Sequence, residues 1–196
     1  MVIFIVLAIL VVVVLFLAVV GHMLINISGQ EVGILERRYF GRGLPEGHVI
    51  AMKGEIGIQA GVLPPGLHVL IPFFYTVRKD VMLVVQQDEV GLVEAIDGRA
   101  LDPGRIFGRH VDGHDTFQDG EAFLRNAGQK GPQIDILPPG KYRINTYLFN
   151  VHTEAAITVP PGQVAVVGAR DGDPIRPGRL LAHYVEGHQA FQDGQA

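Results

Sequence analysis

The stretch Gly57-Ile-Gln-Ala-Gly-Val-Leu-Pro-Pro-Gly66 decides the fold, because its pattern returns at Gly131-Pro-Gln-Ile-Asp-Ile-Leu-Pro-Pro-Gly140, 74 positions later. The same offset relates Glu89–Ala122 to Gln163–Ala196, where 16 of 34 positions are identical. Proline lacks a backbone N–H and cannot donate within a strand ladder, so each Pro-Pro-Gly marks a hinge between two strands. A repeat of this kind indicates chained or stacked β-modules, which is more typical of a scaffold than of an enzyme.

The repeat divides the chain after residue 29 into three units, which we expect to be successive β-modules. They cover residues 30–88, 89–162 and 163–196. The first unit opens with Glu-Val-Gly at Glu31 and the second with the same tripeptide at Glu89, an offset of only 58. Because the later Leu-Pro-Pro-Gly motifs are 74 positions apart, the first unit lacks about 16 residues that the second possesses.

The segment that the first unit lacks lies near Asp112–Gly120 and recurs in the third unit. We expect it to form an inserted hairpin, because its Asp-Gly pairs supply the positive φ that tight turns need. The third unit reaches Ala196 before any Leu-Pro-Pro-Gly of its own. We expect the repeat to continue past this residue in a longer protein, and a coiled coil to follow later.

The N-terminal segment is apolar over its whole length. Met1–Val20 holds no charged or strongly polar residue, and the first charged side chain is Glu31. Twenty helical residues at about 1.5 Å each cover roughly 30 Å, the thickness of the hydrocarbon layer. A cleaved signal peptide would begin with a basic residue and end in a small-x-small site, and neither is present. We therefore expect a retained transmembrane anchor over residues 1–26, with a signal peptide or a buried core helix as the alternatives.

The charges that follow the anchor predict its orientation. Arg37, Arg38 and Arg42 come after the apolar segment, and no basic residue precedes it. Because basic residues tend to stay on the cytoplasmic side, we expect a single-pass membrane protein whose soluble part lies in the cytoplasm.

Short apolar runs separated by Gly, Pro and Asp fill the chain after Gly29, and they predict strands. These runs are Val32–Leu35, Glu55–Ile58, Val81–Val85, Val90–Val93, Ile134–Ile136 and Val164–Val167. Apart from a short turn expected at Glu121–Ala127, no helical period is present after the anchor. The predicted fold class is mainly β: a transmembrane helix, then tandem small modules of Greek-key or barrel-like form, with little other helix.

Composition excludes several classes of function. The formal net charge is -4 with few charged residues and no basic block, so we expect no nucleic-acid partner. The chain has no cysteine, which removes disulfides, thiolate catalysis and cysteine-based zinc sites. Ser28, the only serine, lies beside the anchor, and no nucleophile–base pair stands out. We therefore expect a protein that is not an enzyme and that needs no cofactor.

Three motifs of the first unit resemble the SPFH (band 7) family of stomatins, prohibitins and flotillins. They are Gln30–Glu36, Gly61–Phe74 with its Pro-Gly-Leu-His-Val-Leu-Ile-Pro-Phe core, and Val77–Asp80. The resemblance implies a membrane-tethered scaffold that forms homo-oligomeric rings or cages and organises membrane microdomains or partner proteins. After Gln86 the sequence departs from this pattern. Its Leu137–Asn145 element is similar to the β-repeats of the major vault protein family, so the nearest picture is a flotillin-like protein with extra repeats.

Two further functions remain open beside the scaffold. The first is a regulatory subunit that binds a membrane protease or channel, because some relatives in the resembled family regulate a membrane protease. The second is a metal-binding β-module. The scaffold needs a lipid bilayer and other copies of itself, whereas the regulatory subunit needs a defined membrane-protein partner.

One apolar run after the anchor is a candidate membrane contact. It follows Pro64-Pro65-Gly66, and we single out Leu67, Val69, Ile71, Phe73, Phe74 and Tyr75. Aromatic side chains at the end of such a run are typical of the headgroup region of a bilayer. The alternative interpretation is a buried strand in a small core.

A second constellation is the His-x-Asp-x-His motif of His110, Asp112 and His114. Alternate residues of a strand share one face, so the three side chains could converge on a metal ion. The third unit has Tyr184 and Glu186 at the first two of these positions, so one copy does not keep the ligand set. The alternative is a polar hairpin in which Gly113 turns the chain and the Asp112 side chain bonds local N–H groups.

Overall fold

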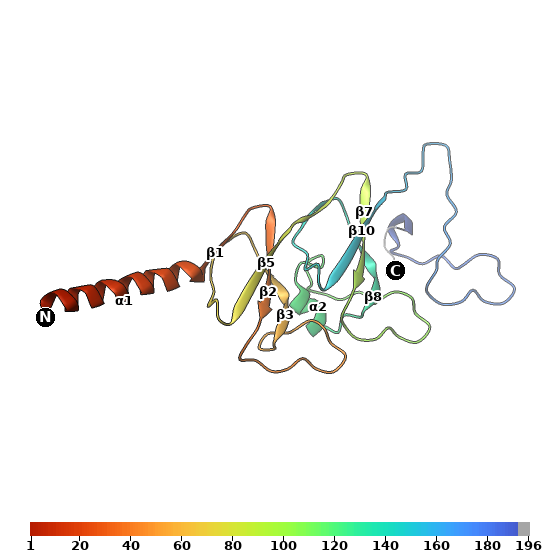
Figure 1. Cartoon of the computed structure of the whole chain (residues 1–196). Helices are drawn as coiled ribbons and strands as arrows, with labels where there is room; N and C mark the ends of the chain where they lie inside the picture. The colour runs from red at the N-terminus through yellow and green to blue at the C-terminus, as the bar shows by residue number, and fades with distance from the viewer. Residues whose placement is uncertain (192–196) are drawn as a thin grey trace.

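The computed structural model describes residues 1–191, so only Phe191 of the last Phe-Gln-Asp-Gly motif lies within the described residues. Figure 1 shows a long helix at one end of the molecule, a region of strands in the middle, and an extended segment at the other end. The helices are α1 (Val2–Met23), α2 (Gly120–Arg125) and the short 3-10 helix η1 (Gln189–Phe191). The strands are β1 (Leu24–Ile27), β2 (Glu31–Arg37), β3 (Gly57–Leu63), β4 (Gly66–Val69), β5 (Tyr75–Val81), β6 (Leu83–Val85), β7 (Glu89–Ala95), β8 (Gly131–Leu137), β9 (Gly140–Tyr142) and β10 (Phe149–Ala155).

Helix α1 confirms the helix predicted for the N-terminal segment. Its 22 residues extend about 33 Å, and none of its apolar window Ile3–Met23 is buried against the rest of the protein. By length and composition the helix is therefore able to cross a membrane. It ends where Leu24 takes an extended backbone conformation, and β1 begins at that residue without a linker.

The two modules predicted from the repeat have the same topology. In the first module β2 lies between β3 and β5, and β1 pairs with β4; in the second β7 lies between β8 and β10, and β6 pairs with β9. Each module thus begins a few residues before the repeat unit predicted at residue 30 or 89, because β1 and β6 precede those residues. All of these pairs are antiparallel. The registers also correspond, since Glu31 faces Val81 and Glu89 faces Ala155. The sequence repeat is therefore a repeat of hydrogen-bonded structure, strand by strand.

The glycine of each Glu-Val-Gly tripeptide is required by a close approach. A Cβ at Gly33 would lie 2.4 Å from Cδ1 of Ile27, and one at Gly91 would lie 3.0 Å from Cβ of Leu137. Val85 also lies near Gly91, so the short strand before each sheet crosses its central strand at the glycine. Only a residue without a side chain lets these strands pack so closely.

The main core lies in the second module and reaches into the first. Three aromatic rings form its centre: Phe117, Phe123 and Phe149, whose centroids lie 5.0 to 6.0 Å apart. Ile50 and Ala60 of the first module belong to the same cluster. A Cβ at Gly120, the first residue of α2, would lie 2.5 Å from the Ala60 carbonyl oxygen. The two modules therefore share a core rather than being joined by a loose linker.

The segment predicted as an inserted hairpin has a different structure. Asp115, Thr116 and Phe117 all have positive φ, and they form a tight left-handed turn instead of two paired strands. Asp119 then caps α2, because its carboxylate accepts the Ala122 N–H at 2.9 Å. The hairpin prediction is wrong because this turn must bring Phe117 into the core, where it is 1% exposed. The short helical turn expected at Glu121–Ala127 is confirmed by α2.

The third unit does not form the predicted strand at Val164–Val167. Residues 162–169 have no strand assignment, and Val164 and Val166 are almost fully exposed. The corresponding strand β7 pairs with β8 and β10, whereas no strand among residues 1–191 pairs with residues 164–167. A strand without partners gains no ladder hydrogen bonds, so this segment stays extended and irregular. Among residues 1–191 the sheets stay open and none closes into a barrel.

Candidate functional site

The predicted membrane-contact run lies at the surface. Leu67, Val69, Ile71 and Phe73 are exposed, and we call these four side chains the apolar face. The largest of them, Phe73, is 78% exposed. The alternative interpretation, a buried strand, does not hold for these residues. An exposed cluster of large apolar side chains is unusual in water and commonly marks an interaction surface.

The last two residues of the run differ from the other four. Phe74 is half-buried and packs edge-on against Phe40, with 5.2 Å between the ring centroids. Tyr75 opens β5 and lies under the Arg37 guanidinium, 5.5 Å from the ring centre. These two aromatic rings therefore have protein partners and do not belong to the apolar face.

Strand pairing places the apolar face at the end of the long helix. Strand β1, which continues α1, pairs with β4, so that Leu24 faces Val69. The Leu70 N–H also donates to the Met23 carbonyl oxygen at 2.8 Å. Residues that are more than 40 positions apart in the sequence are thus held beside the last turn of the helix. If α1 crosses a bilayer, the apolar face lies at the bilayer surface.

The second module carries polar residues at the four positions that correspond to the apolar face. The offset of 74 replaces these apolar residues by Lys141, Arg143, Asn145 and Tyr147. The strand pairing corresponds in both copies, since Ile25 faces His68 and Leu83 faces Tyr142. His68 Nε2 lies 2.7 Å from the Pro64 carbonyl, and the Tyr142 hydroxyl donates to the Pro138 carbonyl at 2.6 Å. The two modules therefore have one backbone design with surfaces of opposite polarity.

The polar copy of this surface docks on the first module. Asn145 is 2% exposed, and its Nδ2 donates to the carbonyl oxygens of Gln59 at 2.8 Å and Ala60 at 3.1 Å. Beside it, the Arg78 guanidinium donates to the Tyr147 hydroxyl at 3.1 Å. Buried carbonyl groups need such donors, so these contacts fix how one module sits on the previous one.

A second joint between the modules is formed by the carboxylate of Asp97, which is 2% exposed. Its Oδ2 accepts the backbone N–H groups of Val49 and Ile50, both at 2.8 Å. Its Oδ1 accepts the Gly98 N–H at 2.7 Å and lies 2.9 Å from Nδ1 of His48. Burial would raise the pKa of the Asp97 carboxyl, but the backbone hydrogen bonds and His48 together lower the pKa below its ordinary value.

The same joint recurs one repeat later at Asp171. One carboxylate oxygen accepts the N–H groups of Ile106 and Phe107, both at 3.0 Å. The other accepts the Gly172 N–H at 2.7 Å and the Arg105 guanidinium at 3.3 Å. These donors, led by the Phe107 N–H, lower the pKa of the Asp171 carboxyl to about 2. We call this arrangement, an Asp-Gly carboxylate on two successive N–H groups, the Asp-Gly clasp.

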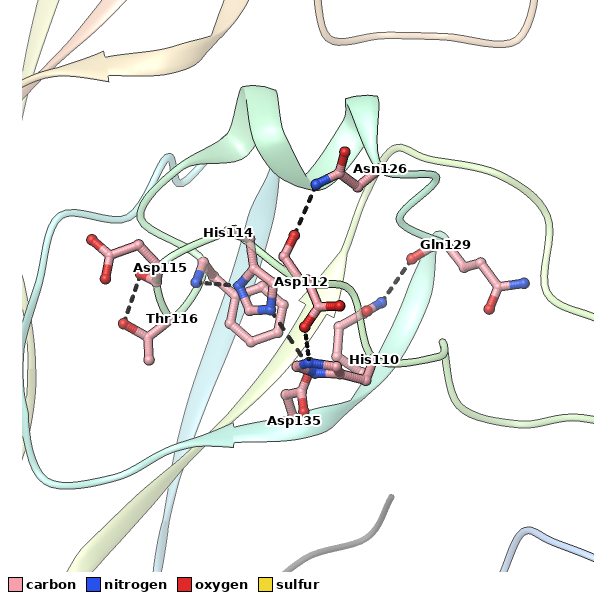
Figure 2. Close-up of polar contacts among 10 residues, drawn as sticks. His110, Asp112, His114, Asp115, Thr116, Asn126, Gln129 and Asp135 are labelled. Atoms are coloured by element: carbon pink, nitrogen blue, oxygen red, sulfur yellow. Dashed lines mark hydrogen bonds and ion pairs between the residues drawn. The ribbon is translucent and has the colours of Figure 1, made fainter. Parts of the chain in front are cut away.

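The predicted metal residues gather with one residue that the sequence did not single out. Figure 2 shows His110, Asp112 and His114 together with Asp135 of β8. His110 Nδ1 lies 2.9 Å from Asp135, and its Nε2 lies 3.1 Å from Asp112. The group with metal-ligand spacing is His110, His114 and Asp135, whose ligand atoms lie within 4.8 Å of one another. The Asp112 carboxylate points into solvent, 99% exposed, so it is the weakest member of the predicted set.

The hydrogen bonding of His114 argues against metal binding. Its Nδ1 accepts the Phe117 N–H at 2.7 Å, so the neutral ring carries its proton on Nε2, which points to Asp135 at 3.7 Å. A metal ion at Nε2 would require that proton on Nδ1 and would break the bond to Phe117. In the third unit, which lacks the first histidine, His188 Nδ1 accepts the Phe191 N–H in the same way, at 3.0 Å. The His-x-x-Phe pattern therefore builds a turn.

The remaining members form a carboxylate–imidazole network. The hydrogen bond to Asp135 raises the pKa of the His110 imidazole above its ordinary value. Burial would raise the pKa of Asp135, but hydrogen bonds from His114 and His110 lower it instead. Asp112 does not bond local N–H groups as the polar-hairpin interpretation predicts. Its backbone carbonyl accepts from Asn126 Nδ2 at 2.9 Å, and this bond ties the loop to the end of α2.

Comparison of the chain with protein-family models, with curated proteins and with solved structures finds no match. The functional argument therefore depends on the geometry of the modules and on the sequence.

Sequence reasoning missed the residues that join the modules. Asp97 and Asp171 each precede a glycine, a pattern that predicts an ordinary turn, and only their recurrence at the repeat offset sets them apart. Asn145 and Asp135 gave no signal, because the first unit has Ile71 and Gly61 at the corresponding positions. Their partners lie 86 and 25 residues away in the sequence and are brought to them by the fold alone.

Proposed function

We propose that this protein is a membrane-anchored scaffold built from tandem β-modules. Helix α1 spans the bilayer, the apolar face of the first module lies in the membrane interface, and the later modules extend away from the membrane. The observation that carries the proposal is the polarity difference between the modules. The apolar face lies in the module attached to the helix, whereas the same positions in the next module are polar and two of them, Asn145 and Tyr147, contact the first module.

The apolar face is well placed for this role. Removing apolar surface from water is favourable by about 25 cal/mol for each square ångström. Contact with a bilayer would therefore stabilise the apolar face. Lys79 of β5 follows the apolar run in the sequence and is exposed, and its cation suits anionic headgroups. The four side chains are apolar in the first module and polar in the second, although the strand pairing corresponds. The fold therefore does not require apolar residues at these positions, and their polarity suits what each module contacts.

The wider role is that of a scaffold for lipids or partner proteins, as the resemblance to the SPFH family implies. Open strand edges support the scaffold role, because they can pair with another copy of the chain. The edge strands are β3, β5, β8 and β10. The soluble modules lie in the cytoplasm in this proposal, in keeping with Arg37, Arg38 and Arg42 after the span. Many weak edge contacts would hold such an assembly together by avidity.

Spin labels at matched positions test the proposal. The chain has no cysteine, so Val69→Cys and Arg143→Cys each provide a single labelling site on the same backbone position of the two modules. With the full chain inserted in liposomes, a label at position 69 should be more accessible to oxygen, which partitions into lipid, than to a water-soluble nickel chelate. The label at 143 should show the reverse. Equal accessibility at both positions would contradict the proposed membrane contact.

A further inference from the structure

The Asp-Gly clasp joins two turns. The Asp-Gly turn supplies the carboxylate, and we call it the clasp donor; the other turn receives the carboxylate on its N–H groups, and we call it the acceptor turn. The acceptor turn occurs three times. Each acceptor is a turn whose glycine has positive φ: 83° at Gly47, 82° at Gly104 and 87° at Gly178. In each turn the next residue closes an i to i−3 backbone hydrogen bond, of 3.2, 3.1 and 3.2 Å in that order. The third turn, Pro177–Leu181, therefore already has the conformation that binds a carboxylate in the other two.

The chemistry of the acceptor is also kept in the third turn. A basic or imidazole side chain follows the glycine each time, as His48, Arg105 and Arg179. The two residues after it supply the pair of N–H groups, which in the third turn are Leu180 and Leu181. Two convergent N–H groups and a neighbouring cation are a suitable site for a carboxylate. Leu181 is 76% exposed, whereas Ile50, its counterpart at the filled first site, is 3% exposed.

We propose that the turn Pro177–Leu181 is a docking site for the Asp-Gly turn of a further β-module of this repeat type. The carboxylate of that turn accepts the N–H groups of Leu180 and Leu181 and pairs with the Arg179 guanidinium. The clasp is thus a head-to-tail connector, in which each module offers an acceptor turn and receives the Asp-Gly of the next one. This inference concerns how modules join and does not depend on the membrane contact.

The identity of the occupant follows from the modules of this chain. The first module has Tyr39 and Phe40 where the second has Asp97 and Gly98, so its opening turn cannot act as a clasp donor. Asp97 is buried at its own acceptor, and Asp171 already occupies the turn at Arg105. At the position that corresponds to Asp97 and Asp171, after the opening segment of a unit, a second copy of residues 1–191 therefore offers no spare Asp-Gly carboxylate. The occupant is a module of the same repeat whose opening strand ends in Asp-Gly.

The test extends the full chain by one period. A second copy of residues 123–196 is added after Ala196, which continues the 74-residue repeat and supplies the next Asp-Gly turn as a copy of Asp171. Hydrogen–deuterium exchange of the peptide covering Leu180 and Leu181 is compared with that of the unextended chain. We expect exchange at these amides to slow at least tenfold. In the matched control, the copied Asp171→Asn change should restore fast exchange. Both carboxylate oxygens accept hydrogen bonds in the clasp, and asparagine replaces one of them by an NH2 group that cannot accept.

The outcomes decide the proposal in either direction. Slow exchange in the added copy of β8 shows that the added module has folded; fast exchange at Leu180 and Leu181 in that case would overturn the proposal. Equal slowing with the acid and with the copied Asp171→Asn variant would also overturn it. If the added module does not fold, the free peptide Gln163–Asp173 at millimolar concentration replaces it, with its Asp171→Asn form as control. Slowing by the acid peptide alone supports the clasp, and no slowing contradicts it.

Discussion

The first and second β-modules have the same strands, the same order and corresponding registers, yet their matching turns contact different surroundings. In the second module the turn after Pro-Pro-Gly carries Asn145 and docks on the backbone of the first module. In the first module the same turn carries Ile71 and Phe73, which are exposed beside helix α1. The difference teaches that in this protein the residues which build the backbone are repeated, whereas the residues which choose a partner are not.

The largest effect is expected from giving the second module the residue of the first. Asn145→Ile removes the donor to the buried carbonyl oxygens of Gln59 and Ala60. Leaving buried acceptors unsatisfied costs about 1–3 kcal/mol for each group, so we expect a loss of about 3 kcal/mol of unfolding free energy. Urea denaturation of the full chain in detergent measures it. The reciprocal change Ile71→Asn lies on an exposed position and should cost less than about 0.5 kcal/mol. Similar losses for both variants would contradict the comparison.

A smaller effect is expected at the inserted segment, which the first module lacks. His114→Leu keeps the apolar bulk against Phe117 but removes the acceptor of the Phe117 N–H. We expect a loss of about 2 kcal/mol, since a buried N–H remains unpaired. Isothermal titration of the unmodified protein with zinc should show no stoichiometric binding. A variant as stable as the parent would contradict the role of His114 in the turn. Zinc binding that His114→Leu abolishes would show that this histidine is a metal ligand.

Acid should weaken the joint between the two modules before it affects either sheet. The pKa of Asp97 is lower in the folded protein than its ordinary value, so the carboxylate stabilises folding above the ordinary pKa. This contribution is lost as the pH falls through the lowered pKa. The unfolding free energy should therefore decrease from pH 5 toward pH 2, and Asp97→Asn should make the decrease smaller. Denaturation at a series of pH values compares the two; parallel curves would exclude Asp97 from the acid response.

The smallest effect on stability is expected from giving the first module the surface of the second. Leu67→Lys combined with Val69→Arg places the residues of the polar copy on exposed positions of β4. We expect a change within about 0.5 kcal/mol, because surface substitutions rarely cost more. A loss above 2 kcal/mol in denaturation would show that these side chains belong to a core and that the apolar face has been misread.

Part of this fold could be predicted from the sequence, because strands and hinges are local patterns. The Pro-Pro-Gly hinges at Pro64 and Pro138 lie between β3 and β4 and between β8 and β9, as predicted. The pattern could not give the turn at Asp115–Phe117, because three successive left-handed residues are favoured only by the burial of Phe117. The strand predicted at Val164–Val167 depends on partners that its own sequence does not contain.

The candidate sites were predicted unevenly for the same reason. The apolar face was found because it is a continuous run, Leu67–Phe74, with an apolar helix in the same chain. The histidine cluster was found only in part, because Asp135 reaches it from another strand. The Asp-Gly clasp was missed, since an Asp-Gly pair also occurs in ordinary turns and its partners at His48 and Arg105 lie far away in the sequence. Recurrence at a fixed offset was the one signal that could have revealed it.

The central claim is that the turn of the first module contacts lipid and the same turn of the second contacts protein. The chain has no tryptophan, so Phe73→Trp and Tyr147→Trp each place a single fluorophore at the corresponding position of the two modules. Each full-length variant is reconstituted in liposomes that contain lipids brominated along the acyl chain. We predict that the tryptophan at 73 emits at shorter wavelength and is quenched by bromine, while the one at 147 is not quenched. Equal quenching of both, or quenching of neither, would contradict the claim.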